Sequence, residues 1–190
     1  RLFQVIILIV SLRVLTTVFT PEELGEYYII LALVSFFNLV LLNPPSMYFG
    51  RNLIKWQESG VLTEALIVLC ISVCLVSIIS PVFLYFFFKY YGNDPGFDLV
   101  HIIALIFMSI LISAIHRNAL YGINTLGFRK EFVTYHVITL LIGLIISIYI
   151  TEFHLTSAIG WLFGIVIAEI ITLPFILKIF ISKYNPSINQ

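Results

Sequence analysis

Three ionisable residues, Arg13, Arg117 and Glu169, lie in or near apolar stretches of this sequence, where a charge is costly. A charge in the middle of a bilayer costs about 3 kcal/mol, so such residues normally face a hydrated cavity or an oppositely charged partner. Arginine suits phosphate ligands because its guanidinium group donates hydrogen bonds in pairs. We therefore expect the three residues to belong to a substrate-binding site, in which an arginine meets an anionic group of the substrate.

Arg13 precedes Thr20, the polar end of its apolar run, by about 10 Å at 1.5 Å per helical residue. On a helical wheel it shares a face with Thr16 and Thr17. We expect its side chain to line a cavity and meet the anionic substrate. Snorkelling of the side chain to the outer headgroups and an internal ion pair remain open as alternatives.

Arg117 belongs to a polar stripe on one helical face, within an arc of about 100°. The members of this stripe are Ser109, Ser113, His116, Arg117 and Asn124. A polar stripe of this kind should not face lipid, which favours a cavity. The other possibility is that Arg117 simply lies at the cytoplasmic interface.

Glu169 lies between Gly164 and Pro174, with Thr172 on the same helical face. Three roles are open for its carboxyl group. It could pair with Arg13 or Arg117, carry a coupling proton, or remain a buried neutral acid.

Two further stripes indicate helix packing more than ligand contact. One consists of His136, Thr139, Gly143 and Ser147, and the other of Thr156, Gly160, Gly164 and Ala168. The second contains a G-x-x-x-G pattern, which lets helix backbones approach closely in membranes. We expect it to serve packing within the bundle, with dimerisation as the alternative.

Catalytic and metal-binding motifs are absent from the sequence. It has no H-E-x-x-H, G-x-S-x-G or Walker loop, and its four histidines lie on separate segments without ligand spacing. We expect no enzyme activity, no metal and no cofactor. A net charge of zero without a basic patch also argues against nucleic acid as a partner.

The composition identifies the class of protein that must position these residues. The chain is 61% hydrophobic and 11% charged, whereas ordinary globular domains are about 45 to 50% apolar and about 25% charged. Only helices and closed barrels satisfy backbone groups in hydrocarbon, and the long apolar runs lack the alternation of barrel strands. The sequence therefore predicts an all-α integral membrane protein in the lipid bilayer.

Polar turns divide the chain into one lobe of six predicted transmembrane helices, with no linker between domains. The spans are Leu2–Phe19, Tyr27–Phe49, Leu62–Phe88, Leu99–Leu120, Phe132–Ile150 and Leu155–Ile181. Thr20 and Pro21 with the acids after them are typical of a helix N-cap at the first turn. Pro44 with Pro45, Pro81 and Pro174 should each bend the helix they interrupt.

The charged residues indicate the orientation. Basic residues gather on one side, namely Arg1, Arg51, Lys55, Arg129, Lys130, Lys178 and Lys183. The other side carries Lys89 and the acids Glu22, Glu23, Glu26, Asp94, Asp98 and Glu152. The positive-inside rule then predicts a multi-pass protein with both termini in the cytoplasm.

The first hairpin resembles the oligosaccharide flippases of the MOP superfamily, which include O-antigen and capsule polysaccharide flippases. The matching elements are Arg13, the turn from Phe19 to Gly25 with Tyr27, and the segment from Asn43 to Arg51. Phe19 stands where many relatives have leucine. Such flippases have two lobes around a central cavity, so this six-span chain looks like the N-terminal lobe, without its C-terminal lobe.

The resemblance implies a transporter of a bacterial or archaeal cell (inner) membrane. It would flip a polyprenyl-pyrophosphate-linked oligosaccharide from the cytoplasmic to the outer leaflet by alternating access. Arg13 matches the basic position that in these flippases lines the cavity and would meet the pyrophosphate. The alternatives are a lobe of a MATE-like small-molecule exporter, which predicts an acidic cavity where we expect a mainly cationic one, and a non-transporting membrane scaffold or remnant.

Overall fold

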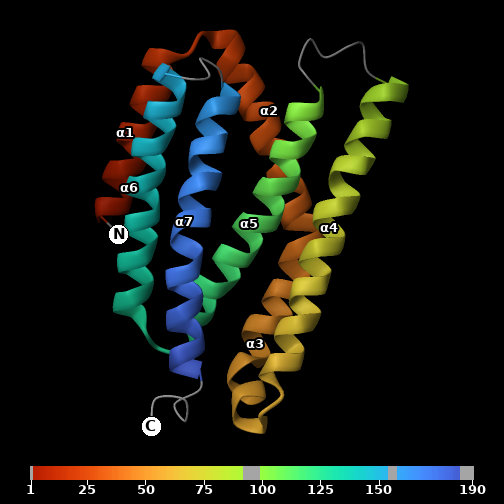
Figure 1. The fold of residues 1–190 in the computed structure, drawn as a ribbon, viewed down its shortest axis with the longest axis vertical. Coiled ribbons are helices and arrows are strands. Elements are labelled where there is room, and N and C mark those ends of the chain that lie inside the picture. Colours follow the sequence, from red (N-terminus) through yellow and green to blue (C-terminus); the bar gives the residue numbers. More distant parts are fainter. Residues whose placement is uncertain (1, 92–98, 154–157, 185–190) are drawn as a thin grey trace.

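The computed structural model describes residues 2–91, 99–153 and 158–184, and these residues form helices without any strand (Figure 1). The predicted all-α fold is confirmed. The helices are α1 Leu2–Val18, α2 Pro21–Phe37, η1 Asn38–Leu42, α3 Asn43–Ser59, α4 Leu62–Tyr91, α5 Leu99–Thr125, α6 Arg129–Phe153 and α7 Ala158–Tyr184.

The helices have the length and apolarity of membrane spans. Within the described residues, five helical stretches are long and apolar enough to cross a bilayer, with Pro21–Ser59 counted as one. The sixth, α1, is apolar but has only 17 residues, close to the shortest helix that spans a bilayer. Large apolar side chains such as Val68 and Ile145 point outward from the bundle, as expected for surfaces in contact with lipid tails.

The turn between α1 and α2 contains the predicted N-cap, in the form of a capping box. The backbone N–H of Glu23 donates to the Thr20 hydroxyl, and the Glu23 carboxylate accepts from the Thr20 backbone N–H at 2.8 Å. Pro21 occupies the first turn, where a missing N–H costs nothing. This arrangement satisfies two of the free donors at the start of α2.

The second predicted span, Tyr27–Phe49, is too short. The chain stays helical from Pro21 to Ser59, a stretch of 39 residues, because a π-helical segment carries it past the two prolines. The backbone N–H of Asn43 donates to the carbonyl of Asn38, five residues back, which absorbs one extra residue before Pro44 and Pro45. The helix ends at Gly60, whose φ of 76° is a left-handed C-cap.

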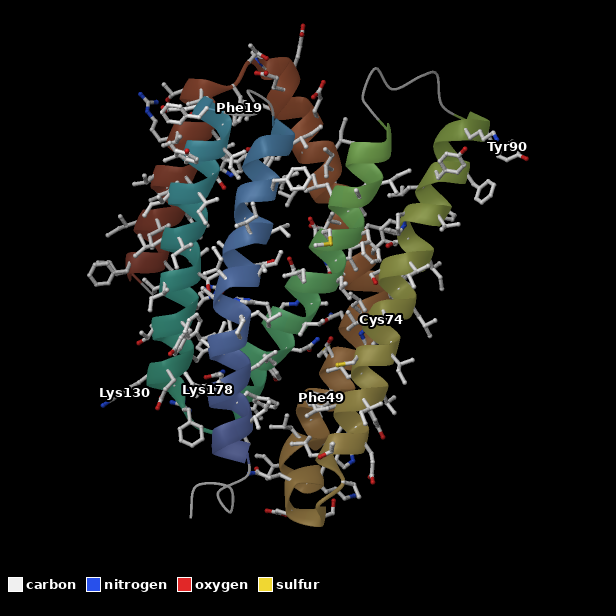
Figure 2. All side chains as sticks on the ribbon, viewed as in Figure 1. Phe19, Phe49, Cys74, Tyr90, Lys130 and Lys178 are labelled. Atoms are coloured by element: carbon white, nitrogen blue, oxygen red, sulfur yellow. The ribbon has the colours of Figure 1, made fainter. Side chains whose placement is uncertain are left out.

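α5 connects two groups of helices. α6 and α7 pack on one side of it and α3 and α4 on the other, while α1 packs against α6 (Figure 1). Lys130 and Lys178 lie toward the end of the bundle that holds the α3–α4 turn, while Phe19 and Tyr90 lie toward the opposite end (Figure 2). The predicted orientation also depends on Arg1, Asp94 and Asp98, which lie outside the described residues.

α6 and α7 form the tightest packing through small residues. A Cβ atom placed on Gly164 would overlap the backbone and hydroxyl of Ser147, and one on Gly143 would sit 3.6 Å from the Cβ of Ala168. The Ser147 hydroxyl also donates to the Trp161 carbonyl at 2.8 Å. Packing within the bundle is therefore confirmed for Gly164 and Ala168, whereas Thr156 and the predicted start of this span at Leu155 lie outside the described residues.

Candidate functional site

A cavity of about 590 Å³ lies between α1, α2, α5, α6 and α7. Leucine side chains of α1 and aromatic side chains of several helices form much of its wall. Its polar lining includes Ser113, His116, Arg117, His136, Thr139 and Glu169. Two of the three predicted substrate-binding residues, Arg117 and Glu169, are thus brought to one cavity from α5 and α7.

Arg117 is held by a neutral partner. Its Nη2 atom donates to Oδ1 of Asn38 at 3.0 Å, a contact between residues 79 positions apart. Asn38 is the first residue of η1, so the guanidinium meets the long α2–η1–α3 helix at its π-helical segment. Arg117 precedes the last residue of α5, Thr125, by about 12 Å, and its contact with the cavity favours the first of the two roles left open for it.

Glu169 is also held by a neutral partner. Its Oε2 atom accepts a hydrogen bond from the Ser113 hydroxyl at 2.5 Å. Ser113 lies one helical turn before Arg117 on the same face of α5. The hydrogen bonds of the acid and of the cation therefore go to neutral groups, and the direct ion pair that the sequence left open is not formed among the described residues.

A buried network of hydroxyl groups surrounds His116. Its Nε2 atom lies 3.1 Å from the Thr172 hydroxyl and 3.3 Å from the Thr139 hydroxyl, and the two threonine oxygens are 3.1 Å apart. All three side chains are buried. The network joins α5, α6 and α7 in the cavity wall, which His116 and Thr139 line. The ring centroids of Phe132 and His136, two further lining residues, are stacked 5.9 Å apart.

Arg13 does not belong to this cavity. Its side chain is exposed on α1, and its carbonyl accepts hydrogen bonds from the hydroxyls of Thr16 and Thr17. The cavity therefore contains one arginine and one glutamate, and the mainly cationic cavity expected from the sequence is not what the described residues form. A substrate role for Arg13 remains a prediction.

Sequence reasoning missed Asn38. A lone asparagine inside an apolar run is a visible signal, because an unpartnered amide is costly in hydrocarbon. Its partner could not be read from the sequence, since the two residues lie on helices that are distant along the chain. The stripe of His136, Thr139, Gly143 and Ser147, which we expect from the sequence to serve helix packing, also lines the cavity.

Among residues 2–91, 99–153 and 158–184, no group of three or more histidine, cysteine, aspartate or glutamate side chains is placed to hold a metal ion. No known protein family, curated protein or solved structure matches the chain. The chemistry of the cavity is therefore the basis on which we infer a function.

Proposed function

We propose that this chain is a lobe of a membrane transporter that flips a polyprenyl-pyrophosphate-linked oligosaccharide from the cytoplasmic to the outer leaflet. The observation that carries the proposal is the arginine in the cavity, Arg117, whose hydrogen bond goes to an amide and leaves its positive charge available. A pyrophosphate crossing hydrocarbon needs such a cation, and the guanidinium fork fits its oxygens.

The rest of the lining suits the sugar part of such a substrate. Tyr28 and Tyr121 add aromatic surface with hydroxyl groups, while Ser11 and Ser113 add hydrogen-bonding groups. Rings with a polar tip bind ligands that are apolar on one face and polar at the edge. The cavity therefore offers contacts for both the pyrophosphate and the sugars attached to it.

In this proposal the lobe works with a second, C-terminal lobe in a bacterial or archaeal cell membrane, and both termini face the cytoplasm. Lys130 and Lys178, at the same end of the bundle, support that orientation through the positive-inside rule. Substrate would enter from the side of these lysines, and alternating access would expose it at the acidic turn that contains Glu23.

The test measures ligand binding through a natural reporter in the cavity wall. The chain has two tryptophans, and Trp161 lines the cavity while Trp56 lies on α3. In a Trp56→Phe variant in lipid nanodiscs, polyprenyl pyrophosphate carrying a disaccharide should change the Trp161 fluorescence in a saturable way, and the free polyprenol should not. Equal responses to the two lipids would contradict the proposal.

Glu169 favours one competing function, a lobe of an exporter for cationic small molecules. An acid in the cavity could bind such a cation or carry a coupling proton. The same fluorescence titration with tetraphenylphosphonium separates the two functions. Binding of this cation that is lost in Glu169→Gln but kept in Arg117→Ala would favour the exporter.

A further inference from the structure

We propose that Asn38 is a positioning residue that holds Arg117 at the cavity without neutralising it and presents it to an anionic headgroup. The inference depends on the proposed function and adds a specific residue to it. It starts from the 3.0 Å hydrogen bond between Arg117 Nη2 and Asn38 Oδ1.

The choice of partner decides what Arg117 can bind. A carboxylate at this position would form an ion pair and cancel the charge that an anionic ligand needs. An amide oxygen satisfies one N–H of the guanidinium, fixes its direction, and leaves the remaining donors and the full positive charge for another ligand. The carboxylate of the cavity, Glu169, accepts its hydrogen bond from Ser113 and not from Arg117, so it attracts the guanidinium across the cavity without occupying its donors.

The π-helical segment places Asn38 for this role. Asn38 begins η1, where the Asn43 N–H donates to the Asn38 carbonyl in place of the usual carbonyl four residues back. A π-helical segment rotates the residues before it relative to those after it, compared with a continuous α-helix. The proline pair, Pro44 and Pro45, follows at once and lacks the N–H groups that would restore the α-helical pattern.

The hydrogen bond therefore joins the arginine of the cavity to the π-helical segment of the long helix. An anion in the cavity binds the remaining donors of the guanidinium while Asn38 keeps its hydrogen bond to Nη2. Asn38 thus acts on the ligand through Arg117.

The test compares the ligand affinities of two variants of Asn38. A purely structural role of Asn38 and a role in keeping the arginine charge available predict different orders of these affinities. Asn38→Asp keeps the acceptor and strengthens its bond to Arg117, whereas Asn38→Ala removes the acceptor. If the role of Asn38 is structural, Asn38→Asp should bind ligand like the native chain. If Asn38 keeps the arginine charge available, Asn38→Asp should be the weaker binder.

The probes are farnesyl pyrophosphate and farnesol, titrated against the Trp161 fluorescence of the Trp56→Phe chain in nanodiscs. We expect Asn38→Asp to weaken farnesyl pyrophosphate binding at least about tenfold, with an unchanged or raised midpoint of thermal unfolding. Asn38→Ala should weaken it by about threefold, the effect of one lost hydrogen bond. Farnesol binding should stay the same in both variants.

Asn52→Asp is the matched control, because it adds the same charge to α3, where Asn52 bonds only to the Tyr48 carbonyl. It should bind farnesyl pyrophosphate like the native chain. Native binding by Asn38→Asp would overturn the inference; if Asn38→Asp fails to fold, native binding by Asn38→Ala would do so. Arg117→Ala distinguishes a failure of this inference from a failure of the proposed function. If Arg117→Ala binds farnesyl pyrophosphate like the native chain, Arg117 does not bind the anion, and the proposed function and this inference both fail. If Arg117→Ala binds weakly while Asn38→Asp binds like the native chain, only the inference about Asn38 fails.

Discussion

The Ser113 hydroxyl donates a hydrogen bond to Oε2 of Glu169, and this contact links α5 to α7 in the wall of the cavity. The bond gives the Glu169 carboxylate a hydrogen-bond donor inside a largely apolar bundle. Ser113 lies one helical turn before Arg117, so the pair also holds the Glu169 carboxylate against the face of α5 that carries the arginine.

Ser113→Ala should lower the free energy of unfolding by about 1 to 3 kcal/mol, because it leaves the Glu169 carboxylate without its donor. The measurement is equilibrium unfolding in detergent micelles. Adding Glu169→Leu should recover most of the loss, since both polar partners are then gone. Ser59→Ala, at the exposed end of α3, is the control and should change little; an equal loss there would show that the effect is not specific to the pair.

Gly164→Ala should destabilise the α6–α7 pair by about 1 to 3 kcal/mol, because the new methyl group meets the backbone of Ser147. Gly25 is the matched control, since a Cβ there has no neighbour within 4 Å. Gly25→Ala should stabilise α2 by about 0.5 to 1 kcal/mol through helix propensity. Thermal unfolding of the two variants should therefore shift in opposite directions, and equal shifts would argue against close packing at Gly164.

Thr172→Val removes a hydroxyl that lies 3.1 Å from both His116 and Thr139. We expect a loss of about 1 to 3 kcal/mol in the free energy of unfolding, because buried polar atoms lose a partner. Thr172→Ser should retain most of the stability. Thr16→Val, which removes only an exposed hydroxyl bonded to a helix carbonyl, should have a small effect. A similar loss in both valine variants would mean that the buried network adds nothing.

Arg13→Ala should abolish polysaccharide export by the complete transporter, and Arg13→Lys should retain part of it, if a further lobe covers the exposed face of α1. The physical reason is that phosphate needs a cation in hydrocarbon and an ammonium group replaces the guanidinium only in part. The measurement is complementation of a strain that lacks its flippase. Full export by the alanine variant at normal expression would leave snorkelling as the explanation of Arg13.

Single cysteines should report the orientation. Cys70 and Cys74 are free thiols and would first be replaced by alanine. A membrane-impermeant maleimide added to intact cells should then label Glu22→Cys, at the acidic turn, and leave Arg129→Cys unlabelled until the cells are opened. The reverse labelling pattern would invert the proposed topology.

The sequence by itself determined the fold class and the presence of the helices, but not the full length of the second one, which extends from Pro21 to Ser59. Long apolar runs without alternation can only be helices in a bilayer, and the capping box at Thr20 is a local pattern that the structure confirms. The close approach at Gly164 was also predictable, because a small-residue stripe depends only on spacing along one helix.

Tertiary structure alone decided how the polar residues are partnered. The bond between Asn38 and Arg117 spans 79 positions, and that between Ser113 and Glu169 spans 56, so no local pattern encodes either. The surroundings of Arg13 could not be read from the sequence either. The helical period predicts which face of α1 carries Arg13, but its exposure depends on which helices surround α1. A helical period shows which side chains share a face, whereas the packing of whole helices determines what that face meets.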